Sequence, residues 1–176
     1  INPCDFNQTN LATLAVAEYK GPVYLRFGRP AVPNFTTNDL GFKIGEGILL
    51  RPGSDVTIVA TGHLVWEALE ASAELKNYDI ESEVINIHTI KPLDENIILN
   101  SVKKTGCIVS AEEHNYMGGL GESIAGLLAT KYPTPMEFVA TQDTFGESGT
   151  PAELMAKYGL NKDAIIQKVL ELKKRL

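Results

Sequence analysis

The chain from residue 55 onwards shows two hydrophobic patterns that alternate along the sequence. One is a short, unbroken apolar run, which is typical of a strand buried on both faces of a sheet. The other is an apolar residue at every third or fourth position, as at Leu64, Ala68 and Ala71, which predicts a helix. The predicted strands are 56–62, 82–88, 107–113 and 136–141. The predicted helices are 64–78, 92–106, 118–132, 150–159 and 161–176.

Capping residues support several of these boundaries. Asp94, Thr150 and Asn161 stand where a side-chain oxygen would accept a hydrogen bond from the first turn of a predicted helix. Gly106 stands where the second of these helices should stop. Strands that alternate with helices of this length predict a mainly parallel sheet with helices on both faces. The expected fold class is therefore α/β, a three-layer sandwich.

The first fifty residues are less regular and predict a different unit. Residues 1–4 are interpreted as the end of a strand and residues 21–30 as a second short strand, with a helix over 11–19 between them. The following stretch is rich in Pro, Asn, Thr and Gly, which is typical of a linker, and a short strand with a turn occupies 48–55. We therefore expect the tail of one α/β domain at 1–30, a linker at 31–49 and a second domain at 50–176.

Composition narrows the class of protein. The 176 residues are 44% hydrophobic and 22% charged, which is typical of a globular domain with its own core. A formal net charge of −6 argues against an extended surface for nucleic acid, but it allows a local basic pocket for an anion. The apolar runs are too short to cross a membrane, and the first residues show no secretory leader. Two isolated cysteines, Cys4 and Cys107, favour a reducing, cytoplasmic setting without a disulfide.

Segment 110–128, SAEEHNYMGGLGESIAGLL, is the densest in residues that carry chemistry. Its three glycines open a predicted helix whose free N–H groups could bind an anion. They equally allow a sharp turn and a close approach of helix to sheet, and this explanation needs no ligand. We therefore favour a structural turn. Glu112 and Glu113 are neighbours on a strand, so they should face opposite sides and not act as a pair on one substrate.

Three histidines, His63, His88 and His114, each follow a predicted apolar strand. All three are therefore expected along the carboxyl edge of the sheet, where open α/β sheets bind ligands. Their spacing is not that of a metal site, because no HxH or HxxxH pattern occurs. A hydrogen-bonded structural role is favoured for each of them, ahead of pocket lining or proton transfer.

Arg26 and Arg29 make LRFGRP the most informative stretch for ligands. Both are expected at the carboxyl end of a strand, and a guanidinium group there fits a phosphate or carboxylate. Ion pairing with some of the 22 acidic residues is the alternative, and chemistry alone does not choose between them. The chain contains no GxSxG, GxGxxG or P-loop motif, so no self-sufficient active site is predicted.

Taken together, several segments resemble the carboxyl-terminal part of the transketolase-like thiamine-diphosphate enzymes. The resemblance covers essentially the whole chain and is nearest to transketolases that are divided into two polypeptides. It rests on NPCDFNQT, GPVYLRFGRP, DVTIVATGHLVWEALEASAEL, EVINIHTIKPLDE and CIVSAEEHNYMGGLGESIAGLL.

The resemblance implies a function that this chain cannot perform alone. The complete assembly would transfer a two-carbon ketol unit between sugar phosphates, using thiamine diphosphate and magnesium. The metal-binding GDG motif and the glutamate that activates the cofactor are not in this sequence. The chain is therefore expected to be inactive by itself and to bind neither cofactor. Arg29, and after it Arg26, is the residue expected to contact the substrate phosphate, and the expected partners are an N-terminal transketolase subunit and a second copy of the chain.

Two other functions remain open. The chain could belong to a related enzyme, such as the beta subunit of a 2-oxo-acid dehydrogenase or deoxyxylulose-phosphate synthase. Arg29 favours a user of sugar phosphates over a user of plain 2-oxo acids. A non-enzymatic association or regulatory domain is the third hypothesis, because no catalytic set lies within the sequence.

Overall fold

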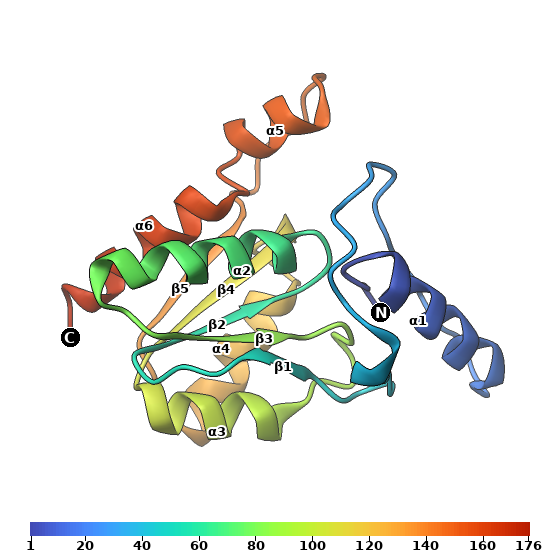
Figure 1. Ribbon diagram of the computed structural model, residues 1–176, viewed down its shortest axis with the longest axis horizontal. Helices are drawn as coiled ribbons and strands as arrows, with labels where there is room; N and C mark the ends of the chain where they lie inside the picture. The colour runs from blue at the N-terminus through green and yellow to red at the C-terminus, as the bar shows by residue number, and fades with distance from the viewer.

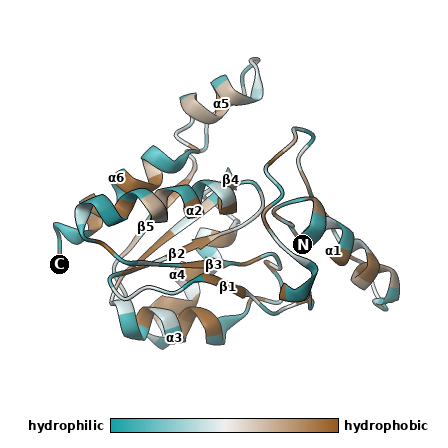
Figure 2. Ribbon diagram, in the orientation of Figure 1, coloured by the Kyte–Doolittle hydropathy of each residue, from teal (hydrophilic) through white to brown (hydrophobic).

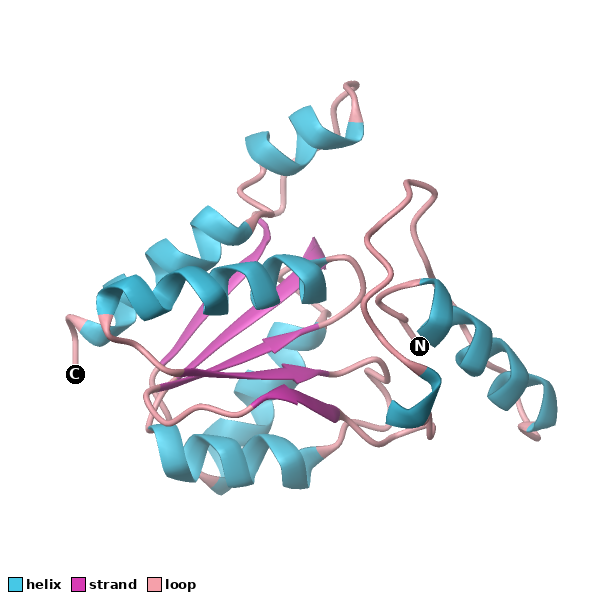
Figure 3. Cartoon of the chain, in the orientation of Figure 1, coloured by secondary structure: helices cyan, strands magenta, loops and turns pink.

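A computed structural model describes all residues from 1 to 176, and its centre is a five-stranded sheet (Figures 1 and 3). The strands lie in the order β1-β3-β2-β4-β5. β1 is antiparallel to β3, and every other neighbouring pair is parallel, so the predicted mainly parallel sheet is confirmed. The strands are β1 (Ile48–Arg51), β2 (Val56–Ala60), β3 (Ser82–Asn86), β4 (Ile108–Asn115) and β5 (Met136–Thr141).

Helices cover both faces of this sheet, as the sequence predicts (Figure 1). α2 and α6 lie on one face, and α3 and α4 lie on the other. Neighbouring strand residues therefore enter different cores: Ile58 belongs to the apolar cluster under α2 and α6, and Val59 to the cluster under α3 and α4. The helices are α2 (Leu64–Leu75), α3 (Glu95–Thr105), α4 (Leu120–Lys131), α5 (Pro151–Lys157) and α6 (Lys162–Lys173), with a 3-10 turn (Lys76–Tyr78) after α2.

The predicted caps form where the sequence places them. The side chains of Asp94, Thr150 and Asn161 each accept a hydrogen bond from a backbone N–H in the first turn of α3, α5 and α6. Gly106 ends α3 in the left-handed conformation, with φ of 75°, which glycine adopts at little cost. These local signals are therefore sufficient to set the ends of three helices.

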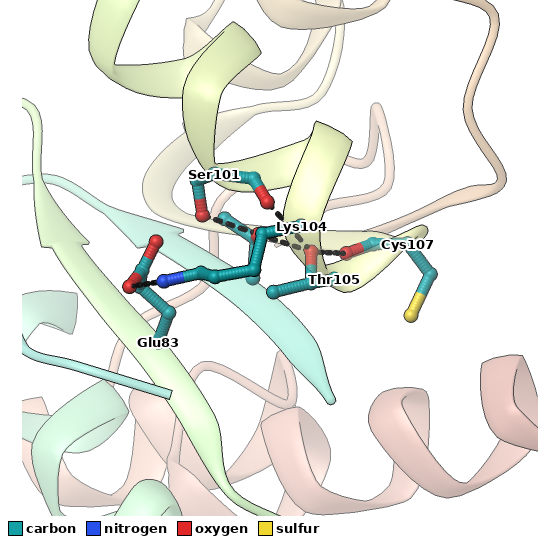
Figure 4. A network of polar contacts seen from close by, with 6 residues as sticks. Glu83, Ser101, Lys104, Thr105 and Cys107 are labelled. Atoms are coloured by element: carbon teal, nitrogen blue, oxygen red, sulfur yellow. Dashed lines mark hydrogen bonds and ion pairs between the residues drawn. The ribbon is translucent and has the colours of Figure 1, made fainter. Parts of the chain in front are cut away.

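Polar contacts fix α3 against the sheet (Figure 4). The hydroxyl of Thr57 on β2 lies 2.6 Å from that of Ser101 and 2.7 Å from that of Thr105. Thr105 also donates to the carbonyl of Cys107, and Lys104 forms an ion pair with Glu83 on β3, as Figure 4 shows. Since these hydroxyl groups are buried, their mutual hydrogen bonds remove the cost of leaving them unpaired.

Residues 1–47, called the N-terminal segment below, pack beside the carboxyl edge of the sheet (Figure 1). Their main element is α1 (Phe6–Glu18), and a 3-10 turn (Asn38–Leu40) lies within the predicted linker. Figure 2 shows apolar positions on α1 even though this helix stands away from the sheet. Only Gln8 and Ala12 of α1 are buried. Residues 48–176 are called the sheet domain.

The prediction of strands at 1–4 and 21–30 is wrong, because neither stretch forms one. Two backbone hydrogen bonds join them: the Ile1 ammonium donates to the Tyr24 carbonyl at 2.8 Å, and the Arg26 N–H donates to the Ile1 carbonyl at 2.9 Å. A ladder needs more residues than this, and no further strand of the chain pairs with 21–30.

Three further observations concern α5, the two cysteines and the length of the helices. α5 projects from the body of the molecule and has no buried residue (Figure 1). Cys4 and Cys107 are both free and buried, and Cys4 lies in an irregular stretch rather than in a strand. No helix is both long and apolar enough to span a membrane.

Candidate anion-binding cleft at the carboxyl edge of the sheet

The order of the strands creates a crevice at the ends of β2 and β4. After β2 the chain crosses one face through α2 to reach β3. After β4 it crosses the opposite face through α4 to reach β5. Two neighbouring parallel strands whose connections run in opposite directions leave a gap at their carboxyl ends, and open α/β sheets bind ligands there.

A cleft of about 330 Å³ lies at this position, partly covered by the N-terminal segment. We call it the switch-point cleft. Its walls combine basic, acidic and aromatic side chains with the first residues of α4. The residues important here are Tyr24, Arg26, Lys91, Glu112, His114 and Leu120.

Asn2 lines the switch-point cleft and joins the N-terminal segment to the residues that follow β2 and β3. Its N–H donates to the carbonyl of His88 at 2.7 Å, and its carbonyl accepts from the N–H of Gly62 at 3.2 Å. The hydroxyl of Thr61 adds a longer contact of 3.3 Å to the same carbonyl. Gly62 has φ of 55°, and a Cβ at this residue would lie 2.4 Å from the Asn2 amide nitrogen. Glycine adopts this left-handed conformation at little cost, whereas a Cβ here would displace the Asn2 side chain.

Glu112 fills the amino terminus of α4. One carboxylate oxygen accepts from the Leu120 N–H at 2.7 Å, and the other accepts from the Gly121 N–H at 2.8 Å. A Cβ at Gly119 would lie 2.2 Å from this carboxylate, so the glycine makes the approach possible. The anion that a helix amino terminus favours is thus supplied by the chain itself. The structural interpretation of the glycine-rich turn is the one that this geometry supports.

The environment of Glu112 acts on its pKa in two directions. Burial of the carboxyl raises the pKa, because the charged form loses its hydration. The two N–H donors of α4 lower it, and the nearby charges of His114 and Arg26 do so to a smaller extent. The net pKa is above the usual value for glutamate.

Glu113 faces the other side of β4, as alternation along a strand predicts. Its carboxylate oxygen lies 3.9 Å from the Nδ1 atom of His63, whereas Glu112 points into the cleft. The two glutamates therefore do not form a catalytic pair, as expected.

The structure does not gather the three histidines into one site. His63 precedes α2 beside Glu113, and His114 is on β4 and lines the switch-point cleft. His88 is fully buried, with its ring centroid 4.2 Å from that of Phe42 and its Nδ1 atom 2.9 Å from the Thr89 hydroxyl. Burial lowers the pKa of His88 to about 4. No group of three or more His, Cys, Asp or Glu side chains is placed to hold a metal ion.

The two arginines of LRFGRP are in different environments. Arg26 is half-buried, donates to the Glu113 carbonyl at 2.9 Å and lines both the switch-point cleft and an adjacent one with His63. Arg29 is exposed and lines neither cleft. Neither forms a salt bridge, so the interpretation as surface ion pairs is wrong.

Sequence reasoning did not single out Lys91 or Tyr24 as cleft residues. The position of Lys91 in the sequence could have identified it as a cleft residue, because it follows a buried strand by a few residues and so lies at the carboxyl edge of the sheet. Tyr24 could not have been identified from the sequence, since only the packing of the N-terminal segment brings it to the sheet.

Comparisons with known proteins point to one family along nearly the whole chain. A family model for the transketolase C-terminal domain matches residues 45–165. The 6-deoxy-6-sulfo-D-fructose transketolase subunit of Clostridium sp. (strain MSTE9) is 42% identical over 98% of this chain and 54% of its own length. A putative transketolase C-terminal section of Methanocaldococcus jannaschii is 38% identical over 99% of this chain and 55% of its own length.

A solved structure agrees with these sequences. It is described as a split gene transketolase, inactive beta4 tetramer, and is 40% identical with a TM-score of 0.93. The match covers 97% of this chain and 56% of that one. The chain belongs to the transketolase family and contains its C-terminal domain. It spans about half the length of these relatives.

Proposed function

We propose that this chain is the carboxyl-terminal part of a transketolase made of two polypeptides. With its N-terminal partner, the assembly transfers a two-carbon ketol unit between sugar phosphates. The observation that carries this proposal is the 38–42% identity, along nearly the whole chain, to a transketolase subunit and to a putative transketolase C-terminal section.

The residues of this chain do not fit thiamine diphosphate or magnesium. The helix amino terminus at the carboxyl edge, which would suit a diphosphate, is filled by Glu112. The acidic side chains form no cluster with the ligand number that a divalent ion needs. The proposal therefore assigns both cofactors to the partner polypeptide and no cofactor step to this chain.

The part assigned to this chain is contact with the phosphate of the substrate. Arg29 is the first candidate and Arg26 the second. Both are free of ion pairs, so their guanidinium groups are available to an anion. Arg29 is exposed beside Phe27, which is itself 59% exposed, so both can meet a ligand or surface on the partner polypeptide.

We also propose how the chain is divided into domains and how it associates with other polypeptides. Residues 1–30 complete an aminopyrimidine-binding domain, residues 31–49 connect the two units, and residues 50–176 form the C-terminal domain. The exposed apolar side chains of the first unit, such as Leu14 and Tyr24, support contact with further polypeptide. We also propose self-association through the C-terminal domain and a cytoplasmic location.

Reconstitution tests the proposed function. The chain is combined with its N-terminal partner, thiamine diphosphate and magnesium, and ketol transfer from xylulose 5-phosphate to ribose 5-phosphate is measured. We expect transfer by the complex and none by either polypeptide alone. A correctly assembled complex without transfer would contradict the proposal.

An assay of the same complex distinguishes a transketolase from the alternative enzyme, deoxyxylulose-phosphate synthase. A 1-deoxy-D-xylulose-5-phosphate synthase of Desulforudis audaxviator is 32% identical over 94% of this chain. Release of carbon dioxide from pyruvate with glyceraldehyde 3-phosphate as acceptor, in place of ketol transfer, would favour that function. A stable complex inactive in both assays would favour the association domain.

A further inference from the structure

The sheet has two outer strands, and they differ in how well they are protected against pairing with a further strand. β1, at one edge, has four residues and an irregular register between Leu49 and Arg51. Short length, a bulge and a charged residue are common means of blocking a sheet edge. β5, at the other edge, has six residues and pairs with β4 in a regular register from Met136 to Val139.

The single charge on β5 does not block its open edge. Glu137 is the only charged residue of this strand. Its carboxylate is paired within the chain, with Lys168 at 3.3 Å and with Arg175 at 2.7 Å. Because the charge is balanced on the α6 side, it does not repel a strand that approaches the edge.

The backbone groups of β5 alternate between β4 and the open side. The carbonyls of Pro135 and Thr141 accept hydrogen bonds from the first residue of β4 and from the residue after its end. Since a strand alternates with a period of two, the residues in even positions direct their N–H and C=O groups outward. These residues are Met136, Phe138 and Ala140. The Ala140 carbonyl accepts from the Gln142 side chain at 2.9 Å, as expected for a carbonyl without a strand partner.

A groove of about 690 Å³ lies along this open side and is called the edge groove below. Four consecutive residues of β5 line it, and α4 and α6 supply its two walls. The walls carry small side chains, such as Ala125 on α4 and Ala164 on α6. Tyr116 and Tyr158 also line it, and tyrosine is enriched in protein interfaces. The edge groove therefore suits a strand that is added to the sheet between the two helical layers.

We propose that the edge groove binds β5 of a second copy of the chain, antiparallel to its own, so that the two sheets join across a two-fold axis. The outward groups then face one another, with Phe138 opposite Phe138 of the second copy and Met136 opposite Ala140. Each pair exchanges two N–H···O bonds, and the second pair sets a large side chain against a small one. The proposal rests on the self-association included in the proposed function and names the surface that performs it.

Charges beside the edge groove favour a second copy in this antiparallel arrangement. Glu122 at the amino end of α4 and Lys131 at its carboxyl end are exposed, and neither forms a salt bridge. A two-fold axis that reverses β5 also reverses α4. The acidic end of each α4 therefore lies toward the basic end of the other, so the two surfaces are complementary in charge.

Sedimentation equilibrium and amide hydrogen exchange of the full chain, over about a hundredfold range of concentration, test this interface. We expect a monomer–dimer equilibrium in which the amides of Met136 and Phe138 exchange more slowly as the dimer forms. The amides of Glu137 and Val139 point toward β4 and should exchange slowly at every concentration. A dimer in which Met136 and Phe138 still exchange rapidly would keep self-association but overturn this surface. A monomer at every concentration would overturn both, and neither result depends on ketol transfer, which reconstitution measures separately.

Matched variants on α4 distinguish the edge groove from other surfaces. Ala125→Arg should weaken association by at least about a hundredfold, because its charge would be buried in the interface without a partner. Ala125 is half-buried, so in the monomer the longer side chain can extend to solvent and the fold is kept. Ser123→Arg is on the exposed, opposite side of α4, outside the edge groove, and should leave association unchanged.

Equal dimerisation of the two variants, with folding checked by circular dichroism, would refute the interface. Protection of the Met136 and Phe138 amides that appears only after the N-terminal polypeptide is added would identify that polypeptide as the occupant and overturn the assignment to a second copy.

Discussion

The N-terminal segment and the sheet domain are stabilised by different interactions. In the sheet domain every residue of β2 and β3 is buried, and apolar clusters lie on both faces. In the N-terminal segment large apolar side chains face solvent, with Phe6 72% and Tyr24 77% exposed. This segment is attached by polar contacts together with a few apolar ones, such as Cys4 in the core and Phe35 against Trp66. An apolar pattern therefore becomes a core only where the same chain supplies the surface to cover it.

Asp5 is the centre of the polar attachment. Its carboxylate accepts from the backbone N–H groups of Gln8, Phe35 and Thr36 and from the Thr36 hydroxyl. The Gln8 side chain then accepts from the Asn86 amide on β3 at 3.0 Å. A buried carboxylate with four donors fixes the position of α1 without a large apolar contact.

The largest expected effect concerns the apolar core. Ile58→Ala should destabilise the sheet domain by about 2–5 kcal/mol, because Ile58 is fully buried and its loss leaves a cavity. Leu14→Ala on α1 should change the free energy of unfolding by less than about 0.5 kcal/mol, because Leu14 is 60% exposed. Urea denaturation of both variants measures the difference. Similar losses in the two would show that the two regions are not stabilised differently.

The junction between the regions should respond to pH through His88. Its pKa falls from 6.5 in the unfolded chain to about 4 in the folded protein. A lowered pKa means that the unfolded state binds the proton first, so stability present above pH 6.5 is lost as the pH falls toward 4.

By this linkage, acidification from pH 7 to pH 4 should cost about 3 kcal/mol at His88. The His88→Asn variant lacks the titrating group. Its free energy of unfolding should therefore fall by about 3 kcal/mol less than that of the unaltered chain between pH 7 and pH 4. Urea denaturation at pH 7, 5.5 and 4 compares the two proteins. Parallel pH profiles would show that burial does not keep this imidazole neutral.

Arg29 tests whether the N-terminal segment serves ligand contact rather than stability. In the reconstituted complex, Arg29→Ala should weaken binding of phosphorylated donors by about 1.5–3 kcal/mol, through loss of a charge-assisted hydrogen bond. Its unfolding free energy should stay near that of the unaltered chain, because Arg29 is exposed and unpaired. Steady-state kinetics give the KM values. An unchanged KM with Arg29→Ala, together with a raised KM for Arg26→Ala, would reverse the order of the two arginines.

Asp5→Ala should loosen the N-terminal segment while the sheet domain stays folded. Loss of the helix cap and its companion bonds is expected to cost about 2 kcal/mol, mostly in local stability. Amide hydrogen exchange should therefore rise by about thirtyfold within residues 5–18 and much less in β2 and β4. Asp39→Ala, at an exposed position in the predicted linker, is the matched control and should leave exchange unchanged. A uniform rise across the chain would mean that the two regions unfold together.

The smallest effect is expected at the rim of the sheet domain. Lys104→Gln removes the ion pair with Glu83, whose side chain is 6% exposed while that of the lysine is 47% exposed. We expect a loss of about 1 kcal/mol, near the upper end for partly exposed pairs. Lys103→Gln has no partner to lose and should be neutral. Thermal denaturation of both variants measures the difference. Equal Tm values would show that α3 is held against the sheet by its hydroxyl contacts and not by this ion pair.

Prediction from sequence succeeded where the determining signals are local. The caps at Asp94 and Thr150 and the turn at Gly106 depend on residues within one turn of helix, and all three form as predicted. Prediction failed at 21–30, because a strand exists only if another strand pairs with it. The opposite directions of Glu112 and Glu113 follow from alternation alone, but their partners, α4 and His63, could not be derived from the pattern.

The sequence by itself determined the alternation of strands and helices in the sheet domain, because hydrophobic periodicity and capping act over a few residues. Only the tertiary structure decided which charges share a cleft. Arg26, Lys91 and His114 are far apart along the chain, and the strand order together with the packing of the N-terminal segment brings them to one edge. That arrangement depends on long-range packing, for which no single stretch of sequence carries the information.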